Sequence, residues 1–314
     1  MSFTSEVKNQ ICNDPLDARQ SRAQLCALFQ MRAALHLSRD GMYISYQTEN
    51  ATIAKHIFQQ VKSCYDVNAR LSVIKKMRLN KNNTYCVEIH EKAMEILEDL
   101  KIWTDAGLNV RPDRSVIRSE KMARAYLQGC FLAGGSVNHP KTTNYHLEIA
   151  CTHTAMAKTV QSLMERFYLP AKSIRRKQSY VVYLKAGDKI GDFLRLCNAS
   201  QALLDFEGVR IQRDFFNQMR RLDNCEIANE MKAVQAAAKQ LEYIAILDAN
   251  RHRVRIPEKI EHVMEMRKQF PEATMQELCD ECYKAYGDII KKSGMKHRLN
   301  KIKTMALALT EDAE

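Results

Sequence analysis

LQGCFLAGGS, at residues 127–136, holds three of the ten glycines in a chain of 314 residues. From Gly129 to Ser136 it fits the phosphate-binding pattern G-x-x-x-x-G-K-S at every position but one, because Gly135 stands where the lysine should be. The residues before it read as a helix, whereas a nucleotide-binding loop follows a strand. Gly129 and Ala133 lie four residues apart on one side of that helix, which lets a second backbone approach closely. The stretch therefore predicts a tightly packed pair of helices.

The partner helix comes from an internal repeat. Residues 51–65 (ATIAKHIFQQVKSCY) and 154–168 (TAMAKTVQSLMERFY) share Ala-Lys at their fourth and fifth positions and both end on tyrosine. At nearly the same offset, LCALFQMRAA at residues 25–34 aligns with LQGCFLAGGS and keeps a small residue, Ala27, at the third position. Agreement between the two offsets indicates a duplication.

The order of predicted elements is the same in both copies. The first has its motif helix, two strands around a Ser-Arg-Asp-Gly turn, a helix at 51–65 capped by Asn50, a hairpin turning at Lys-Asn-Asn and a helix at 91–103. The second has a helix at 119–133, strands near 134–151, a helix at 154–167, a hairpin at 171–185 and a helix at 188–197. Each unit reads αββαββα, so the fold class is α+β, a tandem pair followed by helices alone. The predicted domains are 1–110, 111–205, a connecting long helix at 206–250 and a helix-turn-helix domain at 251–314, with its motif at about 274–307.

The connecting helix carries a narrow apolar seam. Its members are spaced alternately by four and three residues: Ile227, Met231, Val234, Ala238, Leu241 and Ala245. Such a seam docks against a helix of the same chain or forms a dimer. The first is the more common arrangement, so we expect a monomer.

Three short helices follow residue 256. Pro257 begins the first and Pro271 ends it, and Thr274-x-x-Glu277 is a capping box that opens the second. The third is expected to start with Ser293 as its cap. Its apolar stripe consists of Met295, Leu299, Ile302, Ala306 and Leu309. Three short helices, the last amphipathic and basic, are typical of a helix-turn-helix.

Positive charge is concentrated on that third helix. The chain has a net charge of +11 and a pI of about 9.1, which favours a polyanionic partner. Residues 251–288 hold seven Lys/Arg against eight Asp/Glu, whereas 289–303 hold six and none. With the stripe turned inward, the residues predicted to contact DNA are Lys296, His297, Asn300, Lys301 and Lys303 on the outer face, Arg298 at the flank, and Lys291, Lys292 and Ser293 at the start. The alternative is a solvated basic face with no partner.

The two predicted hairpins carry further cations at matching places in the repeats. They are Lys75, Lys76, Arg78 and Lys81 in the first and Arg175, Arg176 and Lys177 in the second. These side chains suit a sheet surface that lies over a phosphate backbone. Lysines at strand edges also serve to block aggregation, so this second interpretation stays open.

Metal, membrane and export functions find little support. Ten cysteines are scattered singly, and Cys279-x-x-Cys282 has only His297 downstream as a third ligand, so we expect reduced thiols, no metal and no cofactor. His146, Cys151 and His153 lack zinc-finger spacing. No apolar run approaches the ~20 residues of a membrane span. The N-terminal sequence has no signal-peptide pattern, so a cytoplasmic, nucleoid-associated protein is expected.

Tandem αββαββα units with small-residue helices at matching places resemble the LAGLIDADG homing endonucleases. In that family the two motif helices pack together, and each presents an acidic residue to a metal at the scissile phosphates. The resemblance places Arg32 and Gly134 where those acids belong. Without carboxylates, metal-dependent phosphodiester hydrolysis loses its ligands.

Three further motifs extend the resemblance over nearly the whole chain. FLAGGSVN (131–138), NCEIANEMK (224–232) and KSGMKHRLNKI (292–302), in this order, resemble the bacterial WhiA family of transcriptional regulators. That family joins a degenerate LAGLIDADG bidomain to a helix-turn-helix similar to the promoter-binding region of sigma factors. The resemblance implies binding to double-stranded DNA, contact with RNA polymerase or another transcription factor, and roles in cell division, chromosome segregation or sporulation. His139 departs from the acidic residue that is usual there.

We therefore interpret the chain as a DNA-binding regulator that is not an enzyme. One alternative is a residual metal-dependent nuclease, which would have to use Asp14, Asp17 or Asp40. The other is a protein-interaction scaffold with a basic tail.

Overall fold

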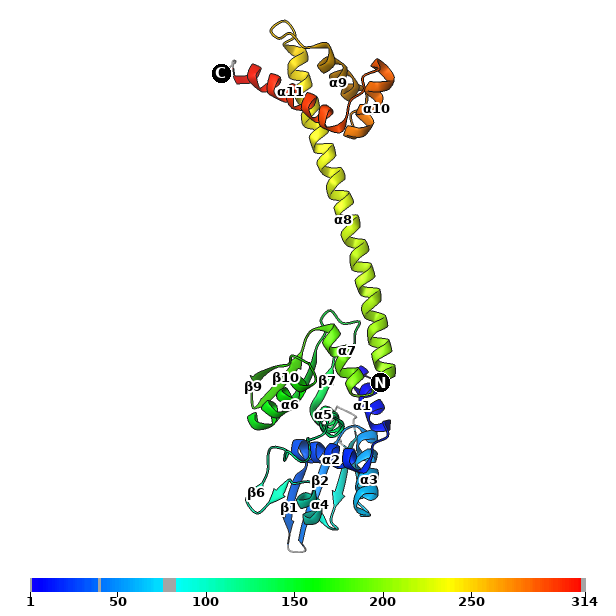
Figure 1. The fold of residues 1–314 in the computed structure, drawn as a ribbon, viewed down its shortest axis with the longest axis vertical. Coiled ribbons are helices and arrows are strands. Elements are labelled where there is room, and N and C mark those ends of the chain that lie inside the picture. The colour runs from blue at the N-terminus through cyan, green and yellow to red at the C-terminus, as the bar shows by residue number, and fades with distance from the viewer. Residues whose placement is uncertain (1, 39–40, 76–82, 312–314) are drawn as a thin grey trace. The chain divides into compact units, whose positions relative to one another are not determined.

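The computed structural model describes residues 2–38, 41–75 and 83–311, and the chain forms two compact units, residues 1–213 and 214–314. Unit 1 mixes helices and sheets, and unit 2 is helical (Figure 1). The predicted α+β class, a tandem LAGLIDADG-like pair followed by a helical domain, is confirmed. Among the described residues, no helix combines the length and the hydropathy that a bilayer span requires.

Unit 1 contains the two predicted repeats. The first consists of α2 (Ala18–Arg32), β1 (Ala34–Ser38), β2 (Gly41–Thr48), α3 (Ala51–Tyr65), β3 (Arg70–Ile74), β4 (Thr84–Ile89) and α4 (Ala93–Asp99). The second consists of α5 (Glu120–Gly134), β7 (Gly135–Val137), β8 (Leu147–Cys151), α6 (Thr154–Arg166), β9 (Lys172–Arg176), β10 (Ser179–Leu184) and α7 (Gly187–Leu196). Both follow the order αββαββα. Their antiparallel sheets have matching strand orders, β1-β2-β4-β3 and β7-β8-β10-β9.

The motif helices α2 and α5 pack against each other in the middle of unit 1, with one sheet on either side (Figure 1). Gly129 is the point of closest approach. A Cβ atom built there would lie 2.5 Å from the backbone oxygen of Gln24 and 2.7 Å from the Cβ of Ala27. The small residue at this position thus permits the contact, as the motif spacing predicts.

A buried polar cluster crosses the same interface. Gln24 of α2 donates to Oε1 of Gln128 of α5 (3.3 Å), and its own Oε1 accepts from Gln60 (2.8 Å) and lies 2.6 Å from Nε2 of His56. Gln128 donates onward to Asp14 (3.2 Å). Burial lowers the pKa of His56 to about 4, so the imidazole is neutral at pH 7.

Three features of unit 1 differ from the sequence-based expectation. A helix, α1 (Phe3–Asn13), precedes the first repeat, and the hydroxyl of Thr4 exchanges hydrogen bonds with the backbone of Val137 in the second repeat (2.9 and 3.0 Å). The expected linker after residue 104 completes a small hairpin, β5 (Trp103–Thr104) with β6 (Gly107–Leu108). The helix expected at 91–103 is only the seven residues of α4.

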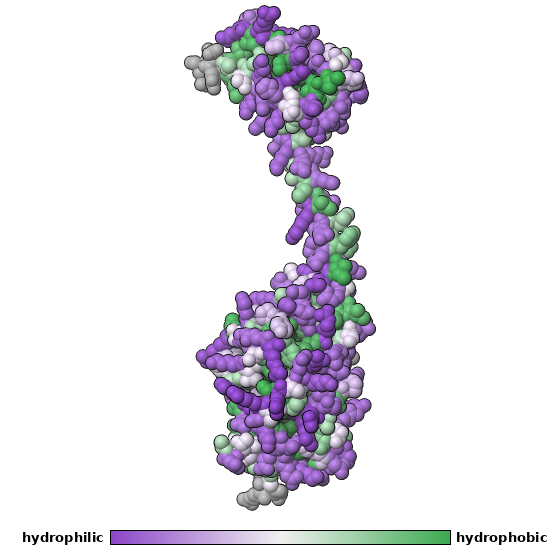
Figure 2. Space-filling view, in the orientation of Figure 1, coloured by the Kyte–Doolittle hydropathy of each residue, from purple (hydrophilic) through white to green (hydrophobic). Residues whose placement is uncertain are grey.

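The long helix α8 (Ser200–Ala249) starts six residues earlier than the expected 206. The predicted docking of its seam inside the chain is wrong for the described residues. Ile227, Met231 and Val234 are 55%, 58% and 51% exposed, and Figure 2 shows apolar residues at the surface of this helix. Within unit 2, the buried face of α8 consists of Ala237, Ile244 and Leu247.

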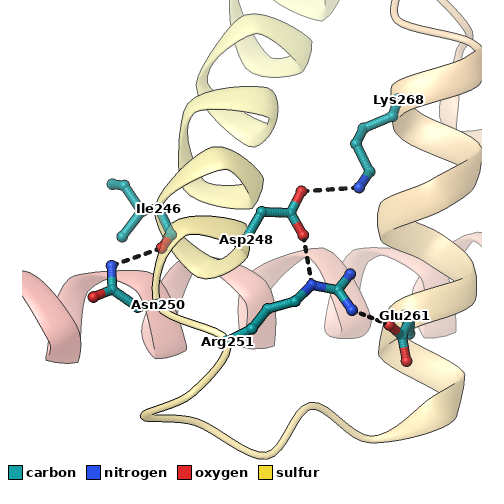
Figure 3. Close-up of polar contacts among 6 residues, drawn as sticks. All are labelled: Ile246, Asp248, Asn250, Arg251, Glu261 and Lys268. Carbon is teal, nitrogen blue, oxygen red and sulfur yellow. Dashed lines mark hydrogen bonds and ion pairs between the residues drawn. The ribbon is translucent and has the colours of Figure 1, made fainter.

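Unit 2 forms its own core from the end of α8 and three helices, α9 (Glu258–Gln269), α10 (Met275–Tyr286) and α11 (Lys292–Glu311). Ion pairs hold α8 to α9 (Figure 3). Asp248 accepts from Arg251 (3.0 Å) and from Lys268 (2.8 Å), and Arg251 also pairs with Glu261 (2.6 Å). Asn250 donates to the backbone oxygen of Ile246 (2.9 Å) as the helix ends.

Candidate nucleic-acid interface

The position of α11 is set by its apolar stripe. Every member of the predicted stripe is buried in the core of unit 2: Met295, Leu299, Ile302, Ala306 and Leu309. Thr274 and Glu277 form the predicted capping box at the start of α10, with distances of 3.3 and 2.7 Å. Gly287 ends α10 in the left-handed conformation, at φ 69°, and leads into the short connection to α11. These contacts fix which side of α11 faces solvent.

The opposite side is exposed and basic. We call the exposed residues Lys296, His297, Asn300, Lys301 and Lys303 the outer face of α11. Lys291 and Lys292, at the start of the helix, are exposed as well. Within the part of the chain that the structure describes, none of these lysines forms an ion pair or a side-chain hydrogen bond. The structure thus brings seven of the predicted contact residues onto one accessible surface with uncompensated charge.

Arg298 does not belong to this surface. Its guanidinium donates to Asp288 (3.0 Å) and to the backbone oxygen of Lys259 (3.2 Å), and its side chain is 18% exposed. Asp288 also lies 3.2 Å from His262 of α9. Arg298 thus lies at the flank of α11, as predicted, but its guanidinium is engaged within the protein and ties α11 to α9 and to the connection before α11.

Ser293 is also placed differently from the expectation. The helix begins at Lys292, and the backbone oxygen of Lys291 accepts from the N–H of Met295 at 3.0 Å. Ser293 lies in the first turn, exposed, and is not the cap that the sequence suggested.

The basic hairpins occupy equivalent edge strands of the two sheets, β3 and β9. Lys75, Arg175, Arg176 and Lys177 are exposed. Lys76, Arg78 and Lys81, with most of the predicted Lys-Asn-Asn turn, lie outside the described residues. Arg176 is 3.7 Å from Glu148 of β8, so part of its charge is offset within the sheet. This surface is more mixed in charge than the outer face of α11.

At the ends of the motif helices, the two positions of the missing acids differ in character. Arg32 is exposed at the end of α2. A Cβ atom on Gly134 would lie 2.4 Å from the backbone oxygen of Ala150 and 3.1 Å from Cε of Met31. The structure thus leaves no room for a carboxylate at position 134 without a shift of β8.

The acids that a residual nuclease would need have other roles. Asp17 caps α2 through the N–H groups of Arg19 (2.9 Å) and Gln20 (2.8 Å). Asp14 accepts from Gln128 and from Asn198 (2.9 Å). Asp40 lies outside the described residues.

No group of three or more metal-ligating side chains occurs among residues 2–38, 41–75 and 83–311. Cys279 and Cys282 are buried in the apolar core of unit 2, where desolvation raises the pKa of both thiols, that of Cys282 to about 11. The pair therefore packs as small apolar side chains.

Three family models match successive parts of the chain. They are the WhiA N-terminal LAGLIDADG-like domain over residues 18–103, the WhiA LAGLIDADG-like domain over 123–216 and the WhiA C-terminal HTH domain over 219–306. Among solved structures, full-length "DUF199/WhiA from Thermatoga maritima" is similar in fold, with a TM-score of 0.58 and 19% identity over 98% of this chain and 99% of that one.

Sequence relatives match over the same extent. The chain is 42% identical over 306 residues to the "Probable cell division protein WhiA" of Staphylococcus aureus strain JH9, which covers 98% of this chain and 96% of that protein. The same figures hold for the protein of strain Newman. With this identity over the full length and three matching domains in order, the chain belongs to the WhiA family.

Proposed function

We propose that this protein is a DNA-binding transcriptional regulator that acts in cell division, and that α11 is its recognition helix. The observation that carries the proposal is the outer face of α11. A buried stripe fixes the helix in place, and the opposite side presents lysines that have no acidic partner among the described residues. A fixed helix with an unpaired basic face matches what the major groove of DNA accepts.

The outer face divides into residues suited to bases and residues suited to phosphates. Lys296 and Asn300 lie four residues apart in the N-terminal half of α11 and are both exposed. An asparagine amide can pair with adenine in the major groove, and a lysine with guanine. Lys291, Lys292 and Lys303 lie at either end of this surface and fit the backbone on both sides of the groove.

We propose that the tandem domain has no nuclease activity. Arg32 would repel a divalent cation, and Gly134 has no space for an acid. The exposed edge strands β3 and β9 remain candidates for auxiliary contacts with the DNA backbone, through Lys75, Lys76, Arg78, Arg175 and Arg176.

The proposed cellular role and partners follow from membership of the WhiA family. Relatives bear the name "Probable cell division protein WhiA", which supports a role in cell division. We propose double-stranded DNA as the main partner, RNA polymerase or another transcription factor as a second, and residence on the nucleoid. Regulation of sporulation genes is a further proposal. The exposed seam of α8 removes the basis for expecting a monomer.

The salt dependence of DNA binding tests the proposal. Each lost phosphate contact lowers the slope of log Kd against log salt concentration by about one unit. Lys303→Ala in the full chain should show that change on specific and random duplexes alike. Lys239→Ala removes the same charge from an exposed position of α8 in the same unit and serves as the control. Equal slopes for the two variants would show that α11 is not the DNA-binding helix.

A further inference from the structure

A cavity of about 730 Å³ opens in unit 1 beside Arg32. Its walls come from α1, from the end of α2, from the end of β2 and the start of α3, from the start of β4 and from the end of α5. Among the described residues, two cations line it, Lys8 and Arg32, against one carboxylate, Glu49. We call it the Lys8 cavity. The two cations outnumber the carboxylate, so the described lining carries a net positive charge.

Lys8 is held in this cavity by α1. Its side chain is half-buried, and its Nζ lies 5.8 Å from the centre of the Phe131 ring, on α5. Within the described residues Lys8 has neither an ion pair nor a hydrogen bond through its side chain. Burial, and next the charge of Arg32, lower its pKa to about 8. A partly desolvated ammonium beside a second cation is unfavourable until an anion joins them.

Two further donors in the cavity, the side chains of Arg32 and Thr84, have no hydrogen-bond partner among the described residues. Arg32 is exposed and makes no hydrogen bond or ion pair with any described residue. Thr84, at the start of β4, is 8% exposed, and its Oγ1 is buried without a hydrogen-bond partner. A guanidinium, an ammonium and a hydroxyl around one hollow are the donor set that a tetrahedral oxyanion uses best, because the guanidinium binds two oxygens at once.

We propose that the Lys8 cavity binds a phosphate group, with Lys8 and Arg32 supplying the charge and Thr84 a hydroxyl. The ligand is a phosphate ester, either a soluble one such as a nucleotide or the backbone of DNA. Binding of the soluble form does not depend on α11, so this site can be tested apart from the recognition helix.

The experiment uses the full chain and two kinds of probe. Inorganic phosphate, pyrophosphate and a nucleoside triphosphate are titrated by calorimetry, and a short DNA duplex is titrated by fluorescence anisotropy. The variants are Lys8→Met, Arg32→Gln and, as a control, Lys158→Met, which removes an exposed lysine from α6 outside the cavity. Lys8→Arg keeps the charge and should retain binding. Circular dichroism confirms that each variant is folded.

We expect saturable binding of at least one soluble probe by the parent. Lys8→Met and Arg32→Gln should each weaken it by about tenfold to a hundredfold, the loss of one charge-assisted hydrogen bond, while the control changes it little. If instead the cavity variants weaken only duplex binding, and the control does not, the phosphate is that of the DNA backbone. The proposal fails if the parent binds no soluble probe and all variants bind the duplex equally, or if Lys158→Met weakens binding as much as the cavity variants do.

Discussion

Gly129→Ala is expected to destabilise unit 1, although alanine is the better helix former. The added Cβ would lie 2.5 Å from the oxygen of Gln24 and 2.7 Å from the Cβ of Ala27, and neither atom can rotate away. Helices α2 and α5 would have to separate along the best-packed interface of the unit. Overpacking of this kind costs ~1–3 kcal/mol, and its upper end applies to contacts with rigid atoms. The higher helix propensity of alanine offsets about 1 kcal/mol of this cost, so the free energy of unfolding should fall by about 2 kcal/mol.

Urea denaturation measured by tryptophan fluorescence provides the assay. Trp103 is the one tryptophan of the chain and packs against the core of unit 1, so its signal reports this unit alone. With a slope of ~2 kcal/mol/M, the midpoint should fall by about 1 M urea.

Gly208→Ala is the matched control. Gly208 lies in α8, and a Cβ there would meet nothing within 4 Å. This variant should be as stable as the parent or up to ~1 kcal/mol more stable. If Gly129→Ala shifts the midpoint upward as Gly208→Ala does, the close approach of the motif helices is refuted.

Three other predictions follow from the same contacts. The double variant Arg32→Asp, Gly134→Asp should not nick supercoiled plasmid with Mg²⁺ or Mn²⁺, because the second acid meets β8 and the described residues supply no group of metal ligands around it. Nicked product above the level of the parent would contradict this. Asp288→Asn weakens the hydrogen bonds to Arg298 and His262, so it should lower the stability of unit 2 by ~1.5–3 kcal/mol in thermal denaturation. Asp223→Asn, at an exposed position of α8, is the control and should leave the stability unchanged. The pKa of His56 is lowered from 6.5 to about 4 on folding, so its neutral imidazole contributes fully to the stability of unit 1 only above pH 6.5. Unit 1 should therefore lose about 3 kcal/mol of stability as the pH falls from 6.5 towards 4. A His56→Gln variant with an equally steep pH dependence would disprove this origin.

The repeated architecture was predictable because its signals are local. The Ala-Lys repeat, the small residues of the motif helix and the cap at Asn50 each report on a few neighbouring residues. Asn50, for example, accepts from the N–H groups of Thr52 (2.8 Å) and Ile53 (3.3 Å) as expected.

Helix α1 was missed because its stabilising contacts are distant in sequence. It buries only three side chains, Phe3, Val7 and Ile11. It contacts α3 of the first repeat and, through the hydrogen bonds between Thr4 and Val137, β7 of the second. The Lys8 cavity could not be predicted for the same reason, because its lining residues come from elements that are distant in sequence.

The spacing of apolar residues predicts neither the residue at which α8 begins nor whether its apolar seam is buried. Periodicity shows that a helix has an apolar face, but it does not show what covers that face. Ile227 and Met231 have the spacing of buried residues and are exposed.

At the candidate interface, the sequence predicts which side of α11 is buried, but it does not predict the contacts of Arg298. The stripe of five apolar residues decides which side is buried, and all five are buried. Arg298 lies at the edge of the stripe, and its partners Asp288 and Lys259 come from outside the helix. Which way a flanking arginine turns depends on such partners, and a single helix does not reveal them.

The central claim is that α11 reads the base sequence of DNA. Selection of preferred sites from a random duplex library, with the parent and with Asn300→Ala in parallel, tests it most directly. The parent should enrich a defined sequence, and Asn300→Ala should lose preference at one position of that sequence at a cost of ~1–3 kcal/mol, with the other positions unchanged. If Asn300→Ala enriches the same sequence with the same preference at every position, α11 is not the reading helix.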